Sequence, residues 1–249
     1  MKHIFAALTF FTRLPFWRLG SVDKRYYKSV VPYWPYTGWL TGGIMCLTLW
    51  VAAQALPYFA AIIMALIARL LVTGALHEDG LADFFDGMGG GTTRERTLSI
   101  MKDSHIGTYG VIALISYFLL ATSLLLAFPL ATACSILFAG DAWSKLCASQ
   151  IINFLPYARN EEEAKNKLVY DRMTGKQLIA AIIGGALPLV YMPLPLLGAA
   201  IFPVVTVTGL ILFMRRRIHG YTGDCCGATF LLAELSFYLG AAILYRLWQ

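Results

Sequence analysis

The chain has 249 residues, of which 58% are hydrophobic and only 14% are charged, and its mean hydropathy is +0.65. Soluble domains carry about 25% charged residues, so this composition excludes an ordinary soluble protein. The net charge of +6 is spread over several loops and forms no basic stripe or nucleic-acid-binding motif. We therefore expect membrane lipid and phosphorylated small molecules as partners, and no nucleic acid.

Apolar residues gather in blocks long enough to cross the roughly 30 Å hydrocarbon core of a membrane as helices. A shorter apolar run in residues 1–17 predicts a helix that lies at the membrane interface. Because backbone groups in lipid need partners within their own segment, we predict an all-α, polytopic integral membrane protein with six or seven transmembrane helices, forming a single domain over residues 1–249. The expected spans are residues 38–56, 58–76, 110–128, 131–155, 178–192, 197–214 and 227–248.

The basic residues predict the orientation of the chain. Of the 20 Lys and Arg residues, 17 lie in the N-terminal segment or in the polar loops 77–109, 156–177 and 215–226. The three exceptions are Arg69, Lys145 and Arg246. Positively charged loops stay on the cytoplasmic side, so we expect a multi-pass protein of the cytoplasmic (inner) membrane with its active site facing the cytoplasm.

The second apolar block runs into an acidic stretch. If the helix of that block continues, Asp79, Asp83 and Asp86 stand at i, i+4 and i+7, which places three carboxylates on one face of the continuing helix. A hard divalent cation would relieve their repulsion, and oxygen-only ligands favour Mg²⁺ over Zn²⁺. We therefore predict a Mg²⁺ site, with Glu78 as a further ligand. The alternatives are a solvated acidic loop, or a zinc site at His77, for which no second His or Cys stands at ligand spacing.

A second polar stretch leads into the third apolar block. Asp103 places a further carboxylate at the same depth in the membrane as the acidic stretch. It could be an additional metal ligand or act as a general base. Lys102, Arg94 and Arg96 could hold phosphate oxygens. For the arginines, a solvated surface position is the alternative.

A third polar stretch precedes the last apolar block. Arg217 belongs to an arginine triplet that either anchors the topology or contacts substrate. Asp224 lies in a glycine-framed turn, where a carboxylate can bind sugar hydroxyls, a base edge or the metal. Asp141 and Lys145, at i and i+4 in the fourth block, are functional candidates or an internal ion pair that fixes helix packing.

Taken together, these three stretches resemble the adenosylcobinamide-GDP ribazoletransferase family, also called cobalamin 5'-phosphate synthase, and their order and spacing match across nearly the whole chain. The positions that carry the resemblance are His77 with residues 79–83 and Asp86-Gly87, then Asp103-Ser104 with Gly107 and Gly110, then residues 222–224 with Gly227-Ala228.

The resemblance implies a Mg²⁺-dependent phosphotransfer. A hydroxyl of α-ribazole, or of α-ribazole 5'-phosphate, would attack the cobinamide-side phosphorus of adenosylcobinamide-GDP, and GMP would leave. Under this hypothesis His77 and Asp103 are catalytic, and Ser104, Asp224 and Arg217 contact the substrates together with the three basic residues named above. A homo-oligomer is compatible with the sequence.

Two other classes of protein share part of this pattern. CDP-alcohol phosphotransferases of phospholipid synthesis also carry spaced carboxylates at the end of a span, but their run continues from Ala to Arg after the Asp-Gly, unlike residues 79–83 here. A transporter would place its binding carboxylates near the middle of the membrane, whereas here they collect at one membrane face. We therefore favour an enzyme.

Overall fold

The computed structural model describes residues 2–159 and 169–249. Within these ranges the chain is helical, and its one β-type pairing is an isolated bridge between Tyr157 and Tyr221. The predicted all-α fold is confirmed. The α-helices are α1 (Lys2–Phe11), α2 (Trp34–Ala52), α3 (Tyr58–Thr73), α4 (Leu76–Gly90), α5 (Arg94–Lys102), α6 (Thr108–Leu125), α7 (Leu130–Ser149), α8 (Ile151–Phe154), α9 (Gly175–Ala186), α10 (Ile201–Arg217) and α11 (Gly223–Trp248). The 3₁₀ segments are η1 (Phe16–Arg18), η2 (Lys24–Ser29), η3 (Val31–Tyr33), η5 (Leu187–Tyr191) and η6 (Leu194–Ala200).

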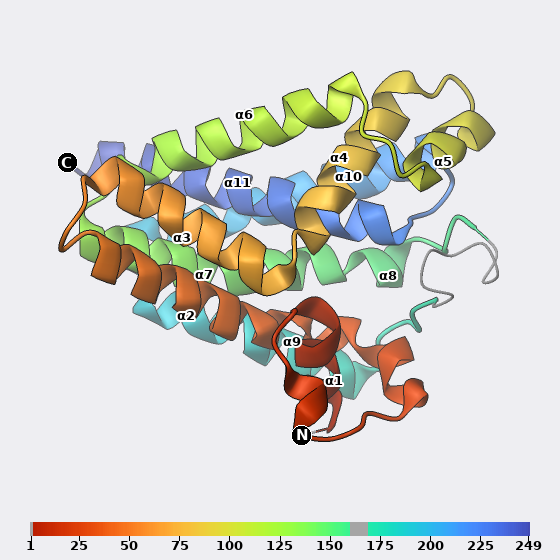
Figure 1. Ribbon diagram of the computed structural model, residues 1–249, viewed down its shortest axis with the longest axis horizontal. Helices are drawn as coiled ribbons and strands as arrows, with labels where there is room; N and C mark the ends of the chain where they lie inside the picture. Colours follow the sequence, from red (N-terminus) through yellow and green to blue (C-terminus); the bar gives the residue numbers. More distant parts are fainter. Residues whose placement is uncertain (1, 160–168) are drawn as a thin grey trace.

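The long helices lie roughly side by side along the long axis of the molecule (Figure 1). α11 is central: it packs against α4, α6, α7 and α10, and most of its side chains are buried. α2 packs mainly against α7 and α3. Large apolar side chains cover much of the outer surface, such as Leu119 on α6 and Val205 on α10, as expected where lipid rather than water surrounds the helices.

Three helical segments of the described chain are long and apolar enough to cross a membrane, namely α6, residues 194–217 and α11. The bent pair α3–α4 is a fourth candidate. The block expected at residues 178–192 forms α9 only as far as Ala186 and then continues as η5 around Pro188, because proline removes a helical hydrogen bond. A multi-pass membrane protein is thus supported, while the expected number of six or seven spans stays a prediction.

The acidic helix does not continue the second span. Gly74 and Ala75 have φ angles of 64° and 56°, in the left-handed region, and they end α3. α4 then leaves at an angle of 92° to α3. The hypothesis of a continuing helix is therefore wrong. The predicted spacing of Asp79, Asp83 and Asp86 still holds, because all three lie on the separate helix α4.

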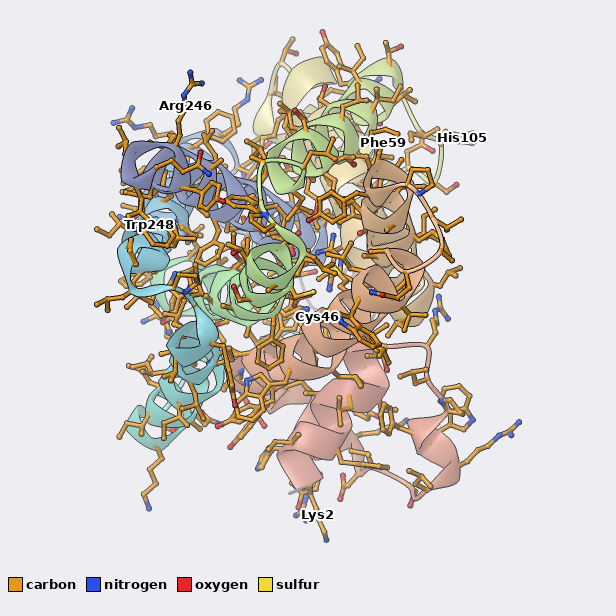
Figure 2. All side chains as sticks on the ribbon, turned by 90° about the vertical axis from the view of Figure 1, so that its left-hand side faces the viewer. Lys2, Cys46, Phe59, His105, Arg246 and Trp248 are labelled. Carbon is orange, nitrogen blue, oxygen red and sulfur yellow. The ribbon has the colours of Figure 1, made fainter. Side chains whose placement is uncertain are left out.

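The polar segments lie towards one end of the molecule. In Figure 1 the N-terminal segment, α4, α5, α8 and the start of α11 lie in the right-hand half, whereas the turns after α2 and α6 lie at the left with the C-terminus. Figure 2 looks from that left-hand end and shows Arg246 and Trp248 at the periphery. The segments that carry the three polar stretches therefore lie towards one end of the helix bundle.

A buried ionic network ties four helices together in the core. Arg69 of α3 donates from Nη1 to both carboxylate oxygens of Glu234 on α11, at 2.5 and 2.6 Å. Its Nη2 donates to the Tyr117 hydroxyl of α6 at 2.7 Å and lies 3.5 Å from Oε1 of Glu78 on α4. A charge buried in the core is costly unless an opposite charge compensates it. We therefore expect this network to fix how the four helices pack.

Asp141 and Lys145 of α7 form a second buried ion pair. The Thr41 hydroxyl of α2 donates to Asp141 Oδ2 at 3.0 Å, and Lys145 Nζ donates to the same hydroxyl oxygen at 2.8 Å. Of the two interpretations of these residues, the structure supports the internal ion pair. The ring of Phe230 lies between the two networks, 4.7 Å from Lys145 Nζ and 5.5 Å from the Arg69 guanidinium carbon.

Candidate active site

A cavity of about 180 Å³ opens where α1, the start of α2, the start of α4, the loop after α8 and the start of α11 meet. Its lining combines apolar and aromatic side chains with charged and polar groups. The lining residues are Phe10, Phe11, Val31, Trp34, Leu76, His77, Asp79, Tyr157, Arg159, Tyr170, Gly223, Asp224, Cys226 and Gly227. Residues from the first and third polar stretches of the sequence therefore meet in one cavity.

Asp79 and Asp224 bring two carboxylates to this cavity from different helices. α4 and α11 can place them there because the two helices touch at glycines. A Cβ built on Gly80 would lie 2.9 Å from the backbone oxygen of Asp224, and one on Gly227 would lie 3.1 Å from the backbone oxygen of His77. The glycines are thus explained by close packing of the helices that carry the site.

A Gly80→Ala substitution should lower the free energy of unfolding by about 1–3 kcal/mol, because the added methyl group meets backbone atoms that cannot rotate away. Gly43→Ala in α2 is the matched control, since a Cβ there has no atom within 4 Å. Thermal unfolding of the two purified variants in detergent measures the difference. Equal unfolding temperatures would contradict the close α4–α11 contact.

The start of α11 faces the cavity and is built as a helix N-terminus. Thr222 is the N-cap, and its hydroxyl oxygen accepts a hydrogen bond from the Cys225 N–H at 3.4 Å. Gly223 follows, and a Cβ there would meet nothing within 4 Å, so packing does not explain this glycine. The exposed N–H groups and the helix dipole make such an end favourable for negative charge. Asp224, in the first turn, lies in this field.

His77 contributes a buried nitrogen to the cavity. Its ring packs edge-on to Phe230, with 4.8 Å between centroids, and 5.4 Å from the ring centroid of Trp34. Nε2 is buried and has no hydrogen-bond partner in the described residues. Buried polar atoms normally have partners, so this nitrogen is a candidate for contact with a ligand.

Asp86 has a structural role that joins the first two polar stretches. Its Oδ2 accepts from the N–H of Gly107 at 2.7 Å, and its Oδ1 accepts from the N–H of Gly110 at 2.9 Å. These are donors at the start of α6, so the carboxylate caps that helix. A Cβ on either glycine would lie 2.5 Å from an Asp86 oxygen, which explains both glycines. The predicted metal role of Asp86 remains untested.

The sequence matches the family described as cobalamin-5-phosphate synthase over residues 3–242. The chain belongs to the cobalamin-5-phosphate synthase family. A protein named adenosylcobinamide-GDP ribazoletransferase from Shewanella frigidimarina (strain NCIMB 400) is 37% identical over 243 residues, which cover 94% of this chain and 92% of the relative. A protein of the same name from Shewanella woodyi is 39% identical over 239 residues, covering 94% and 93%. The one from Leptothrix cholodnii is 36% identical over 245 residues, covering 95% and 93%. No solved structure matches significantly.

Membership of the cobalamin-5-phosphate synthase family makes the chain an enzyme, a transferase of cobalamin biosynthesis. The family resemblance noted in the sequence is thereby confirmed. The roles of individual residues depend on where the structure places them.

The predicted metal ligands are not all gathered in one place. Glu78 points its Oε1 towards Arg69 in the buried network, and Asp83 is buried on α4. In the described residues, no three His, Cys, Asp or Glu side chains lie close enough together to hold a metal ion. Mg²⁺, however, is commonly held by one or two carboxylates with waters and substrate phosphates. Asp79 and Asp224, which line one cavity, fit that donor requirement.

The second polar stretch lies outside the cavity. Lys102, Asp103 and Ser104 are exposed where α5 ends. Asp103 Oδ1 contacts the His105 ring Nδ1 at 2.7 Å and accepts from the His105 backbone N–H at 3.1 Å, and these bonds lower the pKa of Asp103. Figure 2 shows His105 at the outer edge of the molecule. The catalytic role of Asp103 and the substrate-binding roles of its neighbours stay predictions.

Arg94 and Arg217, both predicted to contact substrate, donate to backbone carbonyls, and their substrate roles stay predictions. Arg94 donates from Nε to the oxygen of Ile218 at 2.9 Å and from Nη2 to that of Ala158 at 2.7 Å. Arg217 donates to the carbonyl of Gly91. They hold the loop after α8 and the loop before α11 against α5. Arg96 is exposed.

Arg159 is the site residue that sequence reasoning missed. It lines the cavity and is largely buried. In the sequence it counted only as one of the basic residues that set the topology. The available signal was its place directly after the fourth apolar block, two residues beyond Tyr157. Nothing in that spacing connects it with Asp79 or Asp224, which are distant in the chain.

Proposed function

We propose that the protein joins α-ribazole, or α-ribazole 5'-phosphate, to adenosylcobinamide-GDP, releasing GMP and forming adenosylcobalamin or its 5'-phosphate. The observation that carries the proposal is the cavity in which Asp79, Asp224, His77 and Arg159 meet. The relatives named adenosylcobinamide-GDP ribazoletransferase support the same reaction. Such a transfer needs a positioned hydroxyl, neutralised phosphate oxygens and a stabilised leaving group.

Asp79 and Asp224 would hold Mg²⁺, with Asp83 of the same helix as a further candidate ligand. When bound, the ion neutralises phosphate oxygens and the charge that develops on the departing GMP. The two carboxylates come from different helices held in contact through Gly80 and Gly227. Their spacing is therefore set by the packed core rather than by a flexible loop.

The unpartnered Nε2 of His77 would accept the proton of the attacking hydroxyl. The aromatic wall of the cavity, with Phe11, Trp34 and Tyr170, suits the flat base of the ribazole. Because the cavity measures only about 180 Å³, it would hold the reacting groups, and the large corrin would remain outside. The exposed loop at Lys102, Asp103 and Ser104 would then be available to the outer parts of the substrate.

The direct test is an assay of the purified protein in detergent, supplied with adenosylcobinamide-GDP, α-ribazole and Mg²⁺, with GMP release followed over time. We expect GMP and the cobalamin product in equal amounts, and loss of turnover when EDTA removes the metal. A parallel reaction with a CDP-alcohol and CMP detection tests the phospholipid alternative. CMP release without GMP release would refute the proposal. If the protein is reconstituted into lipid vesicles, substrate uptake without turnover would favour a transporter.

We also propose that the protein lies in the inner membrane with the cavity on the cytoplasmic side, because the basic loops gather at the cavity end. In a cysteine-free background, a cysteine at position 57 should react with a membrane-impermeant thiol reagent added outside the cell. A cysteine at position 216 should react only after the membrane is opened. The reverse labelling pattern would invert the topology.

A further inference from the structure

Among the described residues that line the cavity, Arg159 is the one Lys or Arg side chain. It is only 9% exposed. Its Nη2 donates to the carbonyl oxygen of Leu98 at 2.8 Å, and its Nη1 is buried with no hydrogen-bond partner in the described part of the chain. A buried, charged N–H group without an acceptor is costly. The position of Nη1 is therefore best explained by an acceptor that a ligand brings.

The surroundings of Arg159 favour an anionic ligand once the proposed Mg²⁺ offsets the charge of Asp79 and Asp224, which line the same cavity. The N-terminus of α11 lines the same cavity, and N–H groups in the first turn of a helix are ready donors to phosphate. Gly223 keeps the approach to this turn open among the described residues, because none of their atoms lies within 4 Å of a Cβ built there. An arginine and a helix N-terminus facing one small space are complementary to phosphate oxygens.

The framework around Arg159 is well defined. Arg94 fixes the neighbouring carbonyl of Ala158, and the bridge between Tyr157 and Tyr221 joins this loop to the segment before α11. In that bridge the Ala158 N–H donates to the Tyr221 carbonyl at 2.8 Å. The guanidinium is thus held in place before a ligand arrives, which reduces the entropy lost on binding.

We propose that Arg159 binds a phosphate group of the substrates, together with backbone N–H groups in the first turn of α11. The inference rests on the proposed function, in which two substrates carry phosphate. The phosphate is either the diphosphate of adenosylcobinamide-GDP or the 5'-phosphate of α-ribazole 5'-phosphate. The chemistry of recognition is the same for both.

Calorimetric titration of the protein in detergent, with Mg²⁺ present, distinguishes these sources without turnover, because each ligand is added alone. The ligands are GDP, α-ribazole 5'-phosphate and α-ribazole, of which the last carries no phosphate. Arg159→Gln should weaken the binding of GDP or of α-ribazole 5'-phosphate by about 10- to 150-fold, the effect of losing a hydrogen bond to a charged group. Whichever ligand responds identifies the phosphate. Binding of α-ribazole should be unchanged.

Arg216→Gln is the matched control, because Arg216 is exposed. This variant should bind all three ligands as the wild type does. If Arg159→Gln binds both phosphate ligands like the wild type, or loses all three ligands equally, the proposal is overturned. If the wild type itself binds none of them, the proposed function fails instead. Should Arg159→Gln not fold, Arg159→Lys replaces it: it should bind the phosphate ligand more weakly than the wild type and α-ribazole equally well.

Discussion

Replacing Asp224 by asparagine should lower kcat/KM for ribazole transfer by about 100- to 1,000-fold, the range expected when one preorganised electrostatic group is lost. Asp224 lines the cavity from the first turn of α11, together with Asp79 of α4. Asparagine keeps the size of the side chain but removes the charge that a hard cation requires. The fold should persist, because the amide oxygen of asparagine can still accept from the Thr222 hydroxyl, as Asp224 Oδ2 does at 3.3 Å, and that hydroxyl still accepts from the Cys225 N–H.

Steady-state kinetics over a range of Mg²⁺ concentrations, with thermal unfolding measured in parallel, provides the test. Glu95→Gln is the matched control, because Glu95 is a carboxylate on α5 whose side chain is 79% exposed. We expect the Asp224 variant to need more Mg²⁺ and the Glu95 variant to behave like the wild type. Wild-type kcat/KM with unchanged Mg²⁺ dependence in Asp224→Asn would remove Asp224 from the site.

Replacing Arg69 by methionine should lower the free energy of unfolding by about 3–5 kcal/mol, since removal of one partner leaves a buried charge uncompensated. Arg69 holds both oxygens of Glu234 and the Tyr117 hydroxyl, and it contacts Glu78. The loss would affect α3, α4, α6 and α11 together. Few single substitutions in the chain should destabilise it more.

The measurement is denaturant unfolding of the purified variants in a mixed micelle. Arg246→Met, at an exposed position near the end of α11, is the control and should unfold like the wild type. The double variant Arg69→Met, Glu234→Leu should recover part of the loss, because it removes the charge that Arg69 leaves behind. A double variant less stable than Arg69→Met alone would contradict the ion-pair explanation.

The sequence by itself determined the class of the protein and its family. Apolar blocks separated by charged loops specify membrane helices, because the cost of placing charge or unpaired backbone in lipid depends on composition and length alone. The spacing of Asp79, Asp83 and Asp86 on one helix was likewise readable, since helical periodicity is a local property. The resemblance carried by the three polar stretches agrees with the family match.

Only the tertiary structure decided which of these polar residues share a cavity. The left-handed pair Gly74 and Ala75 turns α4 away from α3, and no local spacing predicts where the turned helix then packs. Asp86 is directed to the N-terminus of α6, and Glu78 to Arg69. Both assignments depend on partners in other helices, which the turn between α3 and α4 and the packing of α4 against α6 bring within reach.

The position of Arg159 in the cavity could not be predicted from the sequence either. Among the basic residues of the chain, nothing local separates it from Arg94 or Arg217, which also border loops. In the folded protein, Arg94 and Arg217 donate to carbonyls, while one nitrogen of Arg159 remains buried beside the cavity. Which arginine faces a ligand is decided by the carbonyls that the packed helices bring within reach, because a guanidinium near an unpaired acceptor is drawn to it.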